Sequence, residues 1–226
     1  MTAPAPTSDR PVIRLRPKMD TRRIRHGFPW AYANEVVTDR RTKAMVPGTI
    51  AVLEDSHRTP LALVAVNPAS KIIARVVDMD VSAEINSEWF ATRLARALDL
   101  RTRLFDAPFY RLIHAEADGL PGVVIDRFDD VLVIQPNAAW ADARLDMLAE
   151  AAMAVTGAHT VLKNAAGRAR SLEGLDDVSS VLHGAAPEGP IPVPMNGAIY
   201  MADVMGGQKT GLFYDQRPNH AFAAGM

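Results

Sequence analysis

The pattern of hydrophobic and polar residues changes at about residue 80. Before that point, short apolar runs rich in β-branched residues are separated by turn signals such as Pro47-Gly48 and Asn67-Pro68, which is typical of strands. The predicted strands lie at residues 12–17, 35–37, 49–55, 61–67 and 71–78. Their spacing suits a small β-barrel over residues 11–80, and no helical period is evident there.

From residue 84 the apolar residues recur at helical spacing. They predict a helix at 84–105, capped by Asn86 or Ser87, and a second helix at 141–155 that ends at Gly157. Between and after these helices the pattern predicts strands at 111–115, 123–127, 131–135 and 160–163, then a short helical segment at 168–173. This arrangement predicts an α+β domain over residues 84–186.

The last forty residues predict a hairpin and the start of a further element. Residues 187–207 are expected to form a linker and a β-hairpin, because Asn196-Gly197 separates two apolar segments and both residues tolerate positive φ. The segment Gly206–His220, GGQKTGLFYDQRPNH, then predicts a loop that leads into a helix, with Asp215 as its cap and Pro218 in its first turn. Because only six residues follow His220, we expect this helix hardly to begin.

The net charge of −1 conceals an asymmetry between the two parts of the chain. Residues 1–80 contain 13 Lys and Arg against 8 Asp and Glu, a net charge of +5, whereas the remainder has 12 against 18, a net charge of −6. Basic residues gather just before the aromatic residues Phe28, Trp30 and Tyr32, a combination that favours RNA, because cations hold the phosphate backbone and an aromatic ring stacks on an unpaired base. The candidate RNA-binding residues are Arg22, Arg23, Arg25, His26 and Trp30. Two alternatives remain open: the arginines form a solvated face, and Trp30 anchors the core of the barrel.

Other features exclude several classes of chemistry. The chain has no cysteine, so it forms no disulfide and offers no thiolate. It has no apolar run of roughly 20 residues and no signal-peptide core, so we expect a cytoplasmic protein without a membrane partner, with residues 1–10 as a disordered tail. If His114, Glu116 and Asp118 lie in a strand, they share one face, but the histidine spacing is unlike that of a metal site, and we expect no metal. Asp126 and Arg127 are expected to pair with each other.

Three motifs, in this order, carry a resemblance to a known family: RHGFPWAYANEV at 25–36, YRLIHAEADGLPGVVIDRFDDVLVIQ at 110–135 and NGAIYMADVMGGQKTGLFYDQR at 196–217. The chain resembles the class I SAM-dependent methyltransferases that act on cytosine C5 of 23S ribosomal RNA and carry an N-terminal PUA domain. The resemblance implies a mixed β and α+β fold. Its parts would be a PUA-like RNA-binding barrel at 11–80, the middle α+β domain, the hairpin, and at 208–226 the start of a truncated Rossmann-like methyltransferase domain that is otherwise missing.

The resemblance also implies site residues and partners. Phe213, Gln216 and Arg217 would contact the cofactor S-adenosyl-L-methionine (SAM), with Arg217 pairing with its carboxylate, although a structural Asp-Arg pair is the alternative. The RNA partner would be ribosomal RNA. Methylation at C5 needs a thiolate that adds to C6 first, and the chain lacks cysteine, so we expect these 226 residues alone to be inactive. A non-catalytic RNA-binding adaptor, or a dimerisation module whose hairpin pairs between two subunits of a homodimer, remains an alternative.

Overall fold

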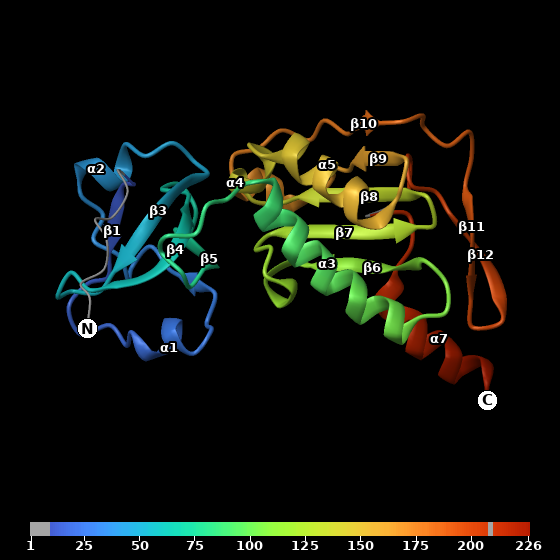
Figure 1. Cartoon of the computed structure of the whole chain (residues 1–226), viewed down its shortest axis with the longest axis horizontal. Helices are drawn as coiled ribbons and strands as arrows, with labels where there is room; N and C mark the ends of the chain where they lie inside the picture. Colours follow the sequence, from blue (N-terminus) through green and yellow to red (C-terminus); the bar gives the residue numbers. More distant parts are fainter. Residues whose placement is uncertain (1–9, 208–209) are drawn as a thin grey trace.

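A computed structural model describes residues 10–207 and 210–226 of the protein. The chain forms an N-terminal domain, a larger second domain and, beyond it, a hairpin and a terminal helix (Figure 1). The tail expected at residues 1–10 lies outside the described residues except for Arg10, whose guanidinium donates hydrogen bonds to the carbonyl oxygens of Val81 and Ala83 at 2.9 and 2.8 Å.

The N-terminal domain is built on a five-stranded sheet with strand order β1-β3-β4-β5-β2. Its strands are β1 (Val12–Arg14), β2 (Trp30–Ala31), β3 (Thr49–Glu54), β4 (Pro60–Val66) and β5 (Ala74–Asp78). β1 pairs with β3 in parallel and the other pairs are antiparallel. The strand expected at 35–37 is reduced to one bridge between Leu15 and Val36.

Two helices of the N-terminal domain escaped the sequence prediction. They are α1 (Arg22–Arg25) and α2 (Arg40–Lys43), each a single turn, and one turn is too short to show a helical period. The side chain of Asp39 caps α2 by accepting a hydrogen bond from the Thr42 backbone N–H at 2.8 Å.

Strand β4 is buried on both faces, which explains its continuous apolar run. On one face Ala62, Val64 and Val66 belong to the core of the N-terminal domain. On the other face Leu63 and Ala65 join the core of the second domain. The two domains therefore meet through apolar contact, and the N-terminal domain is docked on its neighbour.

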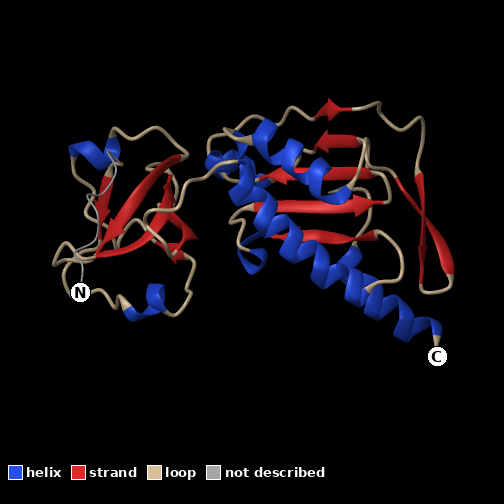
Figure 2. Ribbon diagram, viewed as in Figure 1, coloured by secondary structure: helices blue, strands red, loops and turns tan. Residues whose placement is uncertain are grey.

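The second domain has a five-stranded sheet, ordered β10-β9-β8-β7-β6, with two long helices on one face (Figure 2). The strands are β6 (Phe109–His114), β7 (Val123–Phe128), β8 (Val131–Pro136), β9 (Thr160–Lys163) and β10 (Ser180–His183). The helices are α3 (Ser87–Leu104), α4 (Ala139–Asp142), α5 (Leu145–Thr156), α6 (Arg168–Leu172) and the 3-10 turn η1 (Ala115–Asp118). The cap predicted for the first long helix and the stop predicted for the second are confirmed: the Asn86 side chain accepts from the Trp89 N–H at 2.9 Å, and Gly157 ends α5 at φ 73°. The start predicted at 141 was wrong, because α4 and α5 are separate and α5 begins at Leu145.

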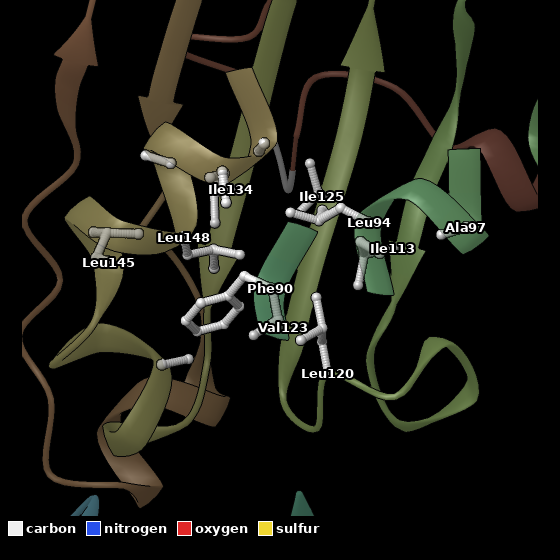
Figure 3. Close-up of a cluster of buried hydrophobic side chains, with 14 of the residues drawn as sticks. Phe90, Leu94, Ala97, Ile113, Leu120, Val123, Ile125, Ile134, Leu145 and Leu148 are labelled. Atoms are coloured by element: carbon white, nitrogen blue, oxygen red, sulfur yellow. The ribbon is translucent and has the colours of Figure 1, made fainter. Parts of the chain in front are cut away.

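The core of the second domain lies between these helices and the sheet (Figure 3). Phe90 and Leu94 of α3 and Leu148 of α5 are fully buried against strand residues such as Ile125 and Ile134. Because α3 and α5 pack side by side over the sheet, they fix the position of its edge strand β6 and of the residues that follow it.

The opposite face of this sheet is covered by the hairpin and the C-terminal segment. The hairpin strands are β11 (Ile191–Met195) and β12 (Ala198–Ala202), and Asn196 and Gly197 make the turn at φ 55° and 76°, as predicted. Buried apolar residues of the hairpin, of strands β6 to β9 and of the segment beyond form one cluster: Phe109, Phe128, Val133, Leu162, Val193, Met195, Ala202, Val204 and Tyr214.

The chain ends in the 3-10 turn η2 (Tyr214–Gln216) and the helix α7 (Arg217–Ala224). Pro218 lies in the first turn of α7, as predicted. The expected cap was wrong, because Gln216 and not Asp215 occupies the N-cap position, and its side chain makes no capping bond. The expectation that this helix hardly begins was also wrong, since α7 has eight residues.

Candidate functional site

Helix α1 and the residue directly after it carry four of the five predicted RNA-binding residues on the surface of the N-terminal domain. Ile24 is buried in the domain core, and this contact turns Arg22, Arg23 and Arg25 outward. His26 follows directly and is exposed too. One apolar anchor in a single helical turn is therefore enough to present a compact group of cations.

These cations differ in how far they are neutralised. Arg22 meets Asp20 at 3.4 Å in an exposed pair, and Arg23 meets Glu35 at 2.7 Å while its guanidinium lies 4.1 Å from the centre of the Phe28 ring. Arg25 has no acidic ion-pair partner within the part of the chain that the structure describes. The Arg22 pair is exposed and contributes little, so Arg22 and Arg25 are available to a phosphate backbone, whereas Arg23 is held by Glu35, whose side chain is only 16% exposed.

Trp30 is placed differently from the arginines. It is half-buried, its indole N–H donates to Glu116 Oε1 at 2.8 Å, and its ring makes edge contacts with Phe28 and Tyr32 at centroid distances of 6.1 and 6.4 Å. Glu116 belongs to η1 of the second domain, so this bond joins the two domains. These contacts place Trp30 at the junction of the two domains and not in the core of the barrel, and its contact with RNA stays a prediction.

A buried polar network continues this junction. Arg75 pairs with Glu116 and Glu173 at 3.1 Å each, and the Asn67 amide donates to the Glu173 carboxylate at 2.9 Å. The prediction that His114, Glu116 and Asp118 share a strand face was wrong, because β6 ends at His114 and the next four residues form η1. No group of three or more His, Asp or Glu side chains among the described residues is arranged to hold a metal ion.

The C-terminal segment is anchored to the sheet at three points. The Thr210 hydroxyl donates to the fully buried Asp126 carboxylate, the Tyr214 hydroxyl donates to the Arg127 carbonyl at 2.9 Å, and Arg217 Nη2 donates to the Phe109 carbonyl at 2.8 Å. Burial raises the pKa of the Tyr214 hydroxyl, and the nearby Asp126 charge adds to this effect. The segment is therefore part of the folded domain. Gln208 and Lys209 of its glycine-rich motif lie outside the described residues.

The sequence predicts a pair between Asp126 and Arg127, but this prediction was wrong: Asp126 pairs with Arg111. Arg111 Nε and Nη2 donate to the two carboxylate oxygens of Asp126 at 2.8 and 3.0 Å. Adjacent strand residues point to opposite faces, so Asp126 and Arg127 diverge, whereas Arg111 lies directly opposite Asp126 in the β6–β7 register.

The structure separates the three predicted cofactor-contact residues. Gln216 lies near the surface and accepts from the Asn219 amide at 2.9 Å, while the Phe213 side chain is 36% exposed. Arg217 lines a cavity, has its Nε buried without a hydrogen-bond partner, and packs its guanidinium 4.6 Å from the Phe105 ring centre. Burial lowers the pKa of Arg217 and Tyr214 opposes the shift, but a guanidinium stays charged.

The cavity, about 290 Å³ in volume, opens at the edge strand β6, between α3 and η2. The sequence analysis did not predict most of the cavity wall. The available signal was the alternation of leucines and charged residues at the end of the first long helix, which was used only to predict the helix. The wall is formed by Leu100, Arg101, Leu104, Phe105, Tyr110, Arg111, His114, Tyr214, Asp215 and Arg217. The site thus combines apolar and aromatic surface with cationic side chains.

None of the helices in residues 10–207 and 210–226 combines the length and the apolar character that a membrane span requires.

Comparison with known proteins first defines the class of the N-terminal domain. Residues 13–78 match the family described as "PUA-like domain". The chain therefore contains a PUA-like domain, as the resemblance implied, and its limits agree closely with the five-stranded sheet and α1.

The whole chain is similar to ribosomal RNA methyltransferases. It is 35% identical over 215 residues to "Ribosomal RNA large subunit methyltransferase I" of Shewanella denitrificans, a match that covers 94% of this chain and 54% of that protein. It is 35% identical over 234 residues to "Ribosomal RNA large subunit methyltransferase" of Deinococcus radiodurans, with 98% and 56% covered. The chain thus spans about half the length of the curated relatives it matches.

Solved structures share the fold. A protein of Streptococcus mutans assigned as a SAM-dependent methyltransferase superposes with a TM-score of 0.78 at 16% identity, covering 94% of this chain and 53% of its own. A second structure, assigned as a methyltransferase and complexed with SAH, superposes with a TM-score of 0.75 at 16% identity, covering 93% and 52%.

These comparisons correct the fold class expected from the sequence. The sequence predicts a chain without its methyltransferase domain. The comparisons show instead that 93–94% of the chain superposes on methyltransferases and is itself part of their fold. The physical reason lies in the last segment. The sequence predicts only the start of a further domain there, whereas hydrogen bonds from Thr210, Tyr214 and Arg217 attach the segment to the sheet and it ends in a formed helix.

Proposed function

We propose that this chain acts in the SAM-dependent methylation of large-subunit ribosomal RNA, with cytosine C5 as the methylated atom. The observation that carries the proposal is the similarity to ribosomal RNA large subunit methyltransferases over 94% of the chain. The structural neighbour complexed with SAH supports SAM as the cofactor.

In this proposal the PUA-like domain recognises RNA. Arg22, Arg23, Arg25 and His26 hold the phosphate backbone, because they are exposed and adjacent, and only Arg23 is held by a partly buried carboxylate. We propose that Trp30, near this cluster, contacts RNA as well. Its bond to Glu116 gives it a structural role in addition. We retain the division into a PUA-like barrel at 11–80, a middle domain at 84–186, the linker and hairpin at 187–207 and the segment at 208–226.

The C-terminal segment is proposed to contact SAM through Phe213, Gln216 and Arg217. SAM supplies a methyl group bound to sulfonium. Arg217 suits its carboxylate, since among the described residues it has no acidic ion-pair partner and its Nε is unpaired. The 226 residues contain no cysteine, so we propose for them recognition of RNA and contact with SAM, not the nucleophilic step at cytosine. Lack of turnover by the chain alone, a cytoplasmic location and a homodimer stay predictions.

The proposal is tested by the salt dependence of binding to fragments of 23S ribosomal RNA. The triple variant R22A/R23A/R25A is expected to bind more weakly and to reduce the slope of log K against log salt by up to about three, because each lost phosphate contact lowers the slope by about one. The matched control is R40A/R41A/K43A, which removes the same charge from the exposed residues of α2.

Equal losses in the two triple variants would mean that only the overall charge of the domain matters, and would refute the assignment to α1. Equilibrium dialysis with labelled SAM measures the cofactor contact on the same protein. RNA binding with no uptake of SAM would favour the RNA-binding adaptor, and absence of RNA binding would refute the proposed function.

A further inference from the structure

The cavity between α3, β6 and η2 has an apolar wall that the fold leaves open. Leu100 and Leu104, one turn apart on α3, are 48% and 64% exposed although they are large and apolar. Phe105 completes this wall and is itself held by stacking on Tyr110, with ring centroids 5.5 Å apart. A flat apolar ligand could therefore lie against a surface whose geometry is already fixed.

The polar groups of the cavity are mostly fixed as well. Arg101 is bound by Asp118 through two bonds of 2.7 and 2.6 Å, and Arg111 is bound by Asp126 in the same two-bond manner. Their charges are thus compensated by carboxylates. What the cavity offers a ligand is the guanidinium of Arg217, with no acidic partner among the described residues, and the exposed His114 and Asp215.

This mixture selects among chemical classes of ligand. A purely apolar molecule would desolvate His114 and Asp215 without offering either side chain a hydrogen bond. A nucleobase suits the site, because it has flat apolar faces and carries both donors and acceptors on its edge. The volume of about 290 Å³ is near the lower end of the range for small-molecule pockets, which suits one nucleotide and not a helix.

We infer that this cavity receives one unstacked nucleotide of the RNA strand, with its base against Leu100, Leu104 and Phe105 and its edge toward His114 and Asp215. The inference rests on the proposed function, because its ligand is RNA, and adds a second RNA contact outside the PUA-like domain. Single-stranded segments are read in this way, by stacking of splayed bases on apolar and aromatic side chains.

The connection between the cavity and the PUA-like domain supports one continuous path for the strand. Trp30, beside the arginines of α1, binds Glu116 of η1, and Asp118 at the end of η1 holds Arg101 in the cavity wall. In Figure 1, β6 is the lowest strand of the second sheet, with α1 below it on the left and α7 below it on the right. The bond between Trp30 and Glu116 thus joins the region of α1 to η1, which directly follows β6.

The test uses the leucines, because Arg217 borders a second cavity of about 320 Å³ and is already proposed to contact SAM. The double variant L100S/L104S is compared with L172S/V178S, whose two apolar side chains are each 63% exposed elsewhere on the domain. Fluorescence anisotropy measures binding to a single-stranded 23S ribosomal RNA fragment and to the same fragment annealed as a duplex. We expect L100S/L104S to bind the single strand about fivefold more weakly or worse, with no change for the duplex or in the control.

Photo-crosslinking to a strand with one 4-thiouridine keeps the test independent of stability. The expected product is an RNA adduct on the tryptic peptide Leu104–Arg111 of the unaltered chain. Wild-type affinity of L100S/L104S together with crosslinks confined to α1 would overturn the inference and leave the proposed function intact. If the unaltered chain binds neither RNA, the proposed function fails, and the inference fails with it.

Discussion

Replacing Arg75 by methionine is expected to weaken the junction between the two domains. Arg75 bridges Glu116 and Glu173, and its side chain is only 15% exposed. Glu173 is 4% exposed, and its carboxylate keeps only the Asn67 amide among the described side chains when Arg75 is removed. Methionine preserves much of the side-chain volume, so the change removes the charge and its hydrogen bonds while largely maintaining the packing.

The magnitude follows from burial. Removing one partner of a buried ion pair costs about 3–5 kcal/mol, because the other charge stays buried and uncompensated. Glu116 is 19% exposed and regains some hydration, so we expect the lower end, about 3 kcal/mol of the free energy of unfolding. Arg103→Met is the matched control, since its pair with Asp99 is 71% and 60% exposed and should contribute less than about 0.5 kcal/mol.

Urea unfolding followed by tryptophan fluorescence measures both variants, and a double-mutant cycle with Glu173→Gln isolates the pair. With a neutral glutamine at position 173, removal of Arg75 leaves no buried uncompensated charge there. The double variant should therefore lose less stability than the sum of the losses in the two single variants. If Arg75→Met unfolds within about 0.5 kcal/mol of the unaltered protein, or if the cycle shows no coupling, the buried network does not hold the domains and the reasoning is refuted.

Two further predictions concern the same junction. Gly48→Ala should destabilise the protein by at least about 2 kcal/mol, because φ is +90° and the added Cβ would lie 2.9 Å from backbone atoms of Ala139. Gly189→Ala, where a Cβ meets nothing within 4 Å, should be nearly neutral in the same thermal unfolding assay, and equal shifts in melting temperature would contradict the steric argument. Burial alone would raise the pKa of Asp78, but hydrogen bonds from the Asp80 N–H, Trp89 and Arg93 outweigh it and lower the pKa below its usual range. The stability that ionised Asp78 provides is therefore present above roughly pH 4 and lost as pH falls through the lowered pKa. Asp78→Asn should accordingly be less stable than the unaltered protein at pH 7 and approach its stability toward pH 2. Melting curves that show a constant difference between the two proteins from pH 7 to 2 would refute this.

The basic surface shows how local sequence leads to a site. The sequence grouped Arg22, Arg23 and Arg25 by proximity, and the structure turns them to one side because Ile24 is buried between them. The helix itself was missed, since one turn leaves no periodic pattern. The aromatic partner was harder to assign, because a tryptophan next to such a cluster serves equally as a base-stacking surface or as a structural anchor, and only the bond to Glu116 shows the second role.

The pairing of the acidic residues shows where local reasoning stops. Asp126 stands next to Arg127 in sequence but pairs with Arg111, fifteen residues away, because strand register and not sequence proximity decides which side chains share a face. In the same way the cavity draws its wall from α3, β6 and η2, elements that are more than a hundred residues apart at the extremes. The periodicity of apolar residues within one element does not predict contacts between elements so far apart in sequence.

The sequence by itself determined much of the local structure of this protein: most of the strands but not β2 and β10, the two long helices, the cap at Asn86, the turn at Asn196-Gly197, the proline in the last helix and the basic segment of α1. Each of these depends on neighbouring residues, through backbone preference or the repeat of apolar positions. Only the tertiary structure decided the junction through Arg75, the anchoring of the C-terminal segment to the sheet and the open cavity beside β6. These depend on the docking of surfaces distant in sequence, because burial and the need to satisfy buried charges act between neighbours in space.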